Sequence, residues 1–349
     1  MNITEFYQEL ETLFVEDEEL SKKYIIDRIE SQKKSIIDLL RKIDEAELQQ
    51  LTVQIRTVED NIRNLYAAIE NSIKSFFNGD LATSRDLIFS TFFDRTKRIN
   101  PLPAKVIPAN TIFYRVRSND TYDLYNEKEM FHIPFEKRKL VSNERYSISG
   151  FPSLYLGSSI YDCWEETNRP NIDTCNVVLV YNKLELYVIN MSIPEYDGSC
   201  FGRMEINSLV LPLVCSLRAN SNDNFKPEYI IPQNVLSCII HRNNEPNENM
   251  KFDGIMYNST VYGKEQCLFK EKKYLKNFVL PIKESKESGW CDKLRDLFEI
   301  TETTSQTKIR LTEDVATIIE RHGIDHGLDS YQCSLLGQLE EKLREKMGL

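Results

Sequence analysis

"GFPSLYLGSSIYDCWEE", residues 150–166 of the 349-residue chain, combines a turn, a strand and a helix in direct succession. Glycine and proline mark the turn, and the apolar run at 153–157 predicts a strand that leads into a helix at 160–167. Tyr155 alternates with two leucines and therefore points away from them. The helix ends on two adjacent acids, Glu165 and Glu166, so that one carboxylate can face back toward the strand.

The sequence on both sides of this stretch is also rich in strands. Short β-rich runs bounded by turn residues predict strands at 111–117, 175–182, 186–190, 253–259, 265–269 and 278–282, with a helix at 206–219. Strands and helices alternate here without a regular βαβ period. This pattern favours an α+β core over a doubly wound sheet.

The N-terminal part is predicted to be helical. No glycine or proline occurs from residue 1 to residue 78. Apolar residues recur at spacings of three and four from Leu48 to Phe76, which predicts a long amphipathic helix. This stripe can pack against an earlier one at 25–43 as an antiparallel hairpin, or it can form a dimerising coiled coil. A short helix capped by Asp80 or Thr83 should follow.

The predicted domain organisation has three parts. Three prolines within residues 101–108 mark a linker after an N-terminal helical domain at 1–100. The α+β core occupies 101–283. A C-terminal helical appendage at 284–349 is expected from helical patterns at 290–300, 312–323 and 330–347, with Thr312 and Ser330 as N-caps.

Composition narrows the classes of function. A formal net charge of −10 and a pI near 5.2 disfavour a protein that coats nucleic acid, because that role needs a cationic face. Eight scattered cysteines without a Cys-x-x-Cys pair indicate reduced thiols. No run approaches the roughly 18 apolar residues of a membrane span. The sequence therefore predicts a cytoplasmic protein without direct nucleic-acid or membrane binding.

Standard metal and nucleotide motifs are absent from the sequence. His322 and His326 flank a glycine-bearing turn instead of sharing a helical face, so no metal site is predicted. Neither a phosphate-binding loop nor a G-x-G-x-x-G motif occurs. If a nucleotide binds, side chains must hold it.

Several arginines are candidates for that task. Arg115 and Arg117 share one face of the strand "FYRVR", and Arg145 lies in "NERYS" before the turn. Guanidinium forks match phosphate oxygens better than lysines do. Ser259 ends the run "GIMYNS". Taken singly, each of these residues is equally compatible with an ordinary surface or turn position.

The order of these elements resembles the RES domain over residues 108–282. The resemblance consists of "YR" in a strand, an arginine-bearing segment, "GFPSLYLGSS" before a helix that ends in glutamate, and the later "GIMYNS". "NERYS" departs from the family, in which many members have glycines and tryptophan. RES domains have a fold similar to ADP-ribosyltransferases, degrade NAD, and typically pair with an Xre-type antitoxin in bacterial toxin–antitoxin modules.

The resemblance implies a role for each candidate residue. Arg115 and Arg145 would hold the pyrophosphate of NAD+, and Tyr155 would stack on the nicotinamide ring. Glu166 would stabilise the oxocarbenium-like charge on the ribose, with the adjacent glutamate as the weaker match. Ser259 would hydrogen-bond the ribose or the amide. NAD+ is then a substrate, and no cofactor is expected.

The sequence therefore predicts an NAD+-consuming toxin or defence enzyme. With water as acceptor it would be a glycohydrolase, and with inorganic phosphate as co-substrate a phosphorylase. A mono-ADP-ribosyltransferase acting on a macromolecule and a non-catalytic ligand-binding protein are the alternatives. A separate antitoxin or immunity protein is expected, because no helix-turn-helix is evident in the chain. The N-terminal helices could also support a homo-oligomer.

Overall fold

In the computed structural model the chain forms two compact units. The first comprises Met1–Lys105, Ser142–Ser149 and Tyr187–Lys264, and the second Val106–Val141, Gly150–Leu186 and Glu265–Leu349. The units interleave along the chain. The boundaries expected near residues 100 and 283 stay predictions, because a compact unit is not by itself an independently folding domain. The structure describes residues 1–14, 18–44, 47, 54–94, 102–195, 203–220, 223–246, 251–259, 275–308 and 334–348.

Helices dominate the first unit. Its N-terminal helices are α1 (Ile3–Leu13), α2 (Glu18–Ser21), α3 (Ile25–Leu40), α5 (Ile55–Phe77) and α6 (Leu81–Ile88), and a π-helical turn follows at Phe89–Phe93. Asp80 caps α6 by accepting a hydrogen bond from the Thr83 amide at 3.0 Å. Its role as an N-cap is therefore confirmed.

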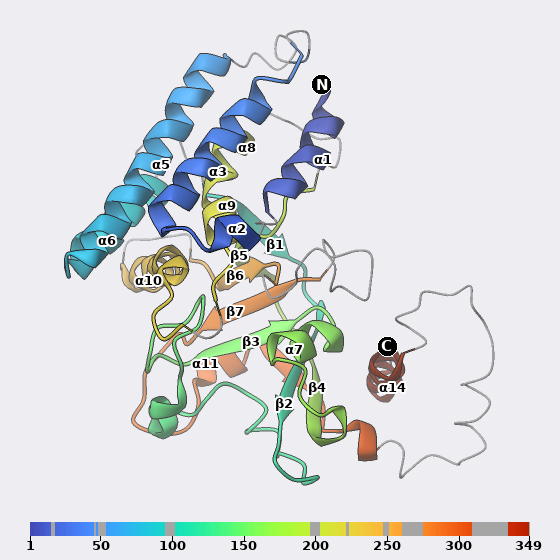
Figure 1. Cartoon of the computed structure of the whole chain (residues 1–349). Coiled ribbons are helices and arrows are strands. Elements are labelled where there is room, and N and C mark those ends of the chain that lie inside the picture. The colour runs from blue at the N-terminus through green and yellow to red at the C-terminus, as the bar shows by residue number, and fades with distance from the viewer. Residues whose placement is uncertain are drawn as a thin grey trace. The chain divides into compact units, whose positions relative to one another are not determined.

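Helices α3 and α5 form the antiparallel hairpin that the apolar stripes predict, and Figure 1 shows them side by side. Arg41 near the end of α3 pairs with Glu59 near the start of α5 at 2.7 Å, and Lys33 pairs with Glu70 at 3.2 Å. The stripe of α5 is buried within the unit. Its fully covered members are Val58, Ile62, Leu65, Ile69 and Ile73. Leu48 and the rest of the expected helix before residue 54 lie outside the described residues, and self-association stays a prediction.

The described part of the first unit contains three further helices. The expected helix at 206–219 is two short ones, α8 (Arg203–Ser208) and α9 (Val210–Cys215). The sequence did not indicate α10 (Ile230–Asn244), which follows the 3₁₀ turn η4 (Pro227–Tyr229). Apolar residues of α10 are buried on several sides, which weakens the one-sided periodicity that reveals a surface helix. Pro232 lies in its first turn, where a missing amide costs no helical hydrogen bond.

A small sheet joins these helices. Strand β5 (Leu186–Met191) pairs in parallel with β6 (Gly254–Tyr257), with Val188 opposite Gly254. Strand β1 (Ala104–Ile107) lies next to β5, where the Asn190 amide donates to the carbonyl of Pro103 at 2.8 Å. The sequence predicted only a linker at residues 101–108, because this segment contains three prolines.

The second unit contains a five-stranded antiparallel sheet in the order β7-β3-β2-β4-β8. Its strands are β2 (Ile112–Ser118), β3 (Ser153–Gly157), β4 (Cys175–Asn182), β7 (Asn277–Pro281) and β8 (Phe298–Ile300). Helix α7 (Ile160–Glu166) follows β3 as expected. The α+β class is thus confirmed, and the specific RES-like fold stays a prediction. The strand expected at 265–269 lies outside the described residues.

The helix expected at 290–300 is wrong. Only α11 (Asp292–Arg295) is helical there, and β8 then pairs with β4, with Ile300 opposite Val180. Phe298 is buried 6.4 Å from the ring of Phe113. Pairing at the sheet edge and burial of this ring therefore override the local helical pattern.

The last described helix is α14 (Leu335–Met347). Its N-cap is Ser334, which accepts from the Gly337 amide at 3.1 Å. Ser330 and the segment at 312–323, with Thr312, His322 and His326, lie outside the described residues. Two 3₁₀ turns, η2 (Phe135–Leu140) and η3 (Ile172–Thr174), complete the second unit.

Two further findings concern the described residues as a whole. None of their helices combines the length and the apolar character needed to cross a membrane. The five cysteines among them are buried, unpaired thiols: Cys163, Cys175, Cys215, Cys238 and Cys291.

Candidate active site

Arg115 lies in β2 of the second unit as a half-buried cation. Its guanidinium donates to the backbone carbonyl of Tyr155 at 2.8 Å. The Nε atom is shielded from solvent and has no hydrogen-bond partner, and no carboxylate of the described residues pairs with the side chain. Burial, with a smaller contribution from the charge of Arg117, lowers the pKa of Arg115 to about 10. Buried cations are usually paired, so this one is suited to an anionic ligand.

Tyr155 links Arg115 to the neighbouring strand β3. Its two leucine neighbours are buried while Tyr155 is half-buried, as the alternation predicts. Opposite it in β7 stands Val279. The hydrogen bond from Arg115 to the carbonyl of Tyr155 therefore fixes the guanidinium beside the strand that leads into α7.

The start of α7 depends on a close approach of the chain to Gly157. A Cβ atom there would lie 2.7 Å from the Sγ of Cys163, which is too close for a side chain. Ser159 caps the helix by accepting from the Asp162 amide at 3.0 Å, and the carboxylate of Glu340 accepts from the Ile160 amide at 2.6 Å. Both acceptors satisfy amides that the first turn leaves without helical partners.

The middle turn of α7 contacts β2, the strand that contains Arg115. The Sγ of Cys163 donates to the backbone carbonyl of Tyr114, the residue before Arg115, at 3.2 Å. Burial raises the pKa of the Cys163 thiol, and the charge of Arg115 acts in the opposite direction. The charge of Arg115 thus acts on Cys163, which lies about one helical turn before the terminal acids of α7.

Those two acids have different surroundings. Glu165 is buried, with 2% of its surface exposed, and it pairs with Arg169 at 2.8 Å. Glu166 is half-buried and accepts a hydrogen bond from the Nδ2 of Asn277 in β7 at 3.0 Å. A neutral amide therefore orients Glu166, whereas a guanidinium compensates the charge of Glu165.

A third acid of α7, Asp162, is fully buried. Its Oδ2 accepts from the Ser158 hydroxyl at 2.7 Å, and Ser158 exchanges two hydrogen bonds with the backbone of Lys276, of 2.8 and 2.9 Å. Burial, with smaller contributions from the charges of Glu166 and Glu340, raises the pKa of Asp162 to about 8. Asp162 is therefore largely protonated at neutral pH, which leaves Glu166 beside a neutral group.

Two predicted site residues belong to the first unit. Arg145 is buried, donates to the Cys215 carbonyl at 2.7 Å and lies 5.1 Å from the ring centre of Tyr229. Ser259 follows β6 and is half-buried. The structure thus places Arg115, Tyr155 and the α7 acids in the second unit and joins Arg115 to Tyr155 by a hydrogen bond. Convergence of Arg145 and Ser259 on them stays a prediction.

Sequence reasoning missed Asp162 and Asn277. Asp162 lies four residues before Glu166, a spacing that places both on one helical face, so this signal was present. Asn277 is a polar residue at the start of an apolar strand, and nothing in the sequence distinguishes it. Within the described part of the chain, no cluster of three metal-ligating side chains occurs.

Comparisons with known proteins give one relative. The chain is 30% identical over 253 residues to a protein of Bacillus subtilis (strain 168) named "Putative toxin YopC". The match spans 65% of this chain and 55% of that protein, little more than half of its length. No model of a known protein family matches the sequence, and no solved structure matches it.

Proposed function

We propose that this chain is a toxin enzyme that consumes NAD+ by cleaving its nicotinamide–ribose bond. The observation that carries the proposal is the Arg115 guanidinium, which is half-buried, lacks a carboxylate partner among the described residues, and is held beside Tyr155. A pyrophosphate would supply the missing anion, with charge-assisted hydrogen bonds to the planar fork.

The acids of α7 supply the second requirement of this chemistry. When the C–N bond breaks, nicotinamide leaves with the bonding electron pair, and positive charge develops on the ribose. An ionised Glu166, oriented by Asn277, would stabilise that charge. The acceptor oxygen then bonds to the anomeric carbon. Water yields ADP-ribose and releases a proton to solvent, whereas inorganic phosphate yields a phosphorylated ADP-ribose.

Tyr155 would complete the site through its ring. It is half-buried in the strand that precedes α7, and a nicotinamide could stack on it. This role rests on the resemblance to RES domains. Arg145 and Ser259 enter the proposal on the same ground.

The relative from Bacillus subtilis supports the toxin part of the proposal. Its name describes a toxin, and the similarity extends over 65% of this chain. A toxin of this kind needs a neutralising partner, so we infer that a separate antitoxin or immunity protein exists. Oligomerisation through the N-terminal helices belongs to the same set of proposals.

Product analysis of the full chain with NAD+ tests the enzymatic part. Wild-type protein should release nicotinamide, and comparison with and without inorganic phosphate identifies the acceptor. Glu166→Gln should lower turnover by about 10²- to 10³-fold, because the amide cannot stabilise the developing charge. Glu165→Gln is the matched control. It makes the same change one residue away, at a carboxylate that pairs with Arg169, and turnover of the folded protein should stay near the wild-type value.

The alternatives give different results in the same assay. Label from NAD+ on a macromolecule would indicate an ADP-ribosyltransferase. No loss of NAD+ under either condition would reject enzymatic cleavage. Toxicity in cells that is unchanged by Glu166→Gln would favour a protein that only binds its ligand.

A further inference from the structure

The second unit contains a pocket that is lined by residues within 127–131 and 286–300. The predicted site residues lie elsewhere in the sequence. The pocket has a volume of about 250 Å³, and none of its ten lining residues is a candidate for NAD+ cleavage. Ligand pockets usually measure about 300–1,000 Å³. The pocket is therefore slightly smaller than this range, so it suits a ligand no larger than a mononucleotide better than a dinucleotide.

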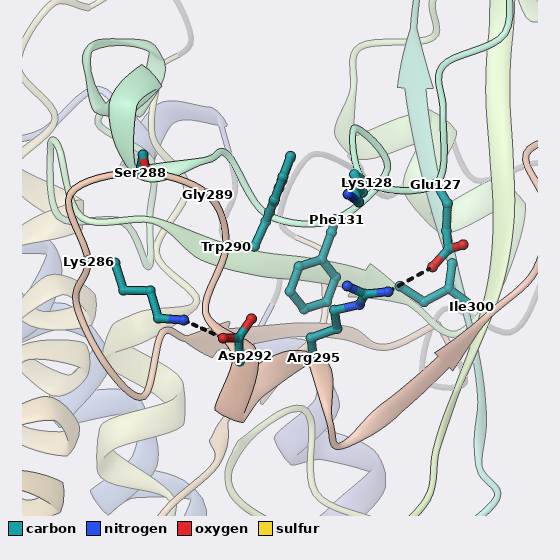
Figure 2. Close-up of a pocket in the computed structure, with 10 residues that line it drawn as sticks. All are labelled: Glu127, Lys128, Phe131, Lys286, Ser288, Gly289, Trp290, Asp292, Arg295 and Ile300. Atoms are coloured by element: carbon teal, nitrogen blue, oxygen red, sulfur yellow. Dashed lines mark hydrogen bonds and ion pairs between the residues drawn. The ribbon is translucent and has the colours of Figure 1, made fainter.

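One side of the pocket is aromatic and apolar. Figure 2 shows the indole of Trp290 and the ring of Phe131 around the same space, with Ile300 of β8 nearby. The Nε1 of Trp290 is shielded from solvent and has no hydrogen-bond partner in the described part of the chain. A buried N–H normally has an acceptor, so a ligand that brings one would satisfy it.

Three cations lie around the same space: Lys128, Lys286 and Arg295. Two acids accompany them, with Arg295 paired to Glu127 at 3.8 Å and Lys286 paired to Asp292. The acids are 50% and 68% exposed, and ion pairs at such exposed positions contribute little to stability. An incoming phosphate can therefore replace them at little cost. The local excess of positive charge contrasts with the net charge of −10 on the whole chain.

The loop that carries Trp290 is fixed on both sides of the indole. Gly289 has φ +78°, and its amide donates to the carboxylate of Glu136 at 2.8 Å. On the other side, the Cys291 amide donates to the Nε2 of His132 at 2.9 Å. Because burial lowers the pKa of His132 to about 4, this nitrogen stays an acceptor at neutral pH. The indole is thus presented in a preset position, which reduces the ordering cost of binding.

We propose that this pocket binds a small ligand in which a planar aromatic ring carries a phosphate group, as in a mononucleotide. The base would stack on Trp290, as nucleic-acid bases stack on aromatic side chains in other proteins. The phosphate would contact Lys128 and Arg295, and the unpaired indole N–H would donate to the ligand. The pocket shares no lining residue with the proposed cleavage site, and binding there does not depend on NAD+ turnover.

The chain has two tryptophans, which makes the proposal directly testable. In a Trp164→Phe variant of the full chain, Trp290 is the remaining tryptophan. Titration with AMP should quench its emission with saturation, and calorimetry on the wild type should give the same dissociation constant. Adenosine and inorganic phosphate should each bind at least about tenfold more weakly, because each keeps only one of the two contacts.

Charge variants test whether AMP binds in the pocket or is only attracted to cations on the surface. Arg295→Gln should weaken AMP binding about three- to tenfold. Lys293→Gln is the matched control, because Lys293 is 67% exposed, pairs with Glu284 and does not line the pocket. Trp290→Ala, measured by calorimetry, should remove most of the binding. An unchanged emission and no heat at millimolar AMP would overturn the proposal, and so would equal effects of the Arg295 and Lys293 variants.

Discussion

Replacing Asp162 with asparagine should remove part of the pH dependence of the unfolding free energy. Asp162 is fully buried, and burial raises its pKa from 3.8 to about 8. Between these values the folded state keeps the proton that the unfolded state has released. The stabilising contribution of this carboxyl is thus complete below the unfolded pKa of 3.8 and is lost as pH rises toward 8, at about 1.4 kcal/mol per pH unit.

Asparagine has the same shape and does not titrate. Its amide oxygen can still accept the hydrogen bond from Ser158, which the wild-type carboxyl accepts at 2.7 Å. The new amide nitrogen can change the unfolding free energy, but this change is the same at every pH. The unfolding free energy of Asp162→Asn relative to wild type should therefore increase by about 4 kcal/mol from pH 4 to pH 7.

Urea denaturation followed by tryptophan emission measures this difference. Both tryptophans, Trp164 and Trp290, belong to the second unit, so their emission reports the unfolding of the unit that contains Asp162. Subtracting the variant from the wild type at each pH cancels the titration of all other groups. A difference that stays constant from pH 4 to pH 7, or that changes in the opposite direction, would refute the assignment of a buried, protonated Asp162.

Three other substitutions test separate parts of the structure. Gly157→Ala should destabilise the second unit by about 1–3 kcal/mol in the same urea assay, because the new Cβ would lie 2.7 Å from the Sγ of Cys163. Glu228→Gln should destabilise the first unit by about 3 kcal/mol, measured by circular dichroism, because it leaves the buried cation of Arg28 without its ion-pair partner. Asn277→Leu should lower kcat for NAD+ more than it changes KM, because it removes the amide that orients the proposed catalytic carboxylate; a change confined to KM would argue against this role.

Local sequence patterns were sufficient for strands β2 to β7 and for α7. Residues 153–157 and 175–182 are short β-rich runs that pack in a sheet, and both strands have the expected bounds. The segment 290–300 was different, because its local pattern is helical while β8 forms only through pairing with β4. The interleaving of the two units likewise depends on long-range contacts, which leave no signal in a window of a few residues.

The candidate site likewise contains residues that the sequence revealed and residues that it did not reveal. Tyr155 and the terminal acids of α7 were recognisable because turn, strand and helix follow one another directly in the sequence. Asn277 comes from a strand 111 residues after Glu166, and only the pairing of β3 with β7 brings it to the end of α7. Residues that orient a functional group from a distant strand are therefore the part of a site that a single sequence reveals least.

The acids around α7 show why position in the helix matters more than the number of carboxylates. Glu340 accepts a hydrogen bond at the N-terminus of the helix, Asp162 is protonated by burial, and Glu165 is compensated by Arg169. Had all of these groups been ionised and uncompensated, their repulsion would raise the pKa of Glu166 and favour its protonated form. Because Asp162 is protonated and Glu165 is paired with Arg169, these two neighbours add little repulsion to a negative charge on Glu166. That is the charge which stabilisation of an oxocarbenium-like ribose would require.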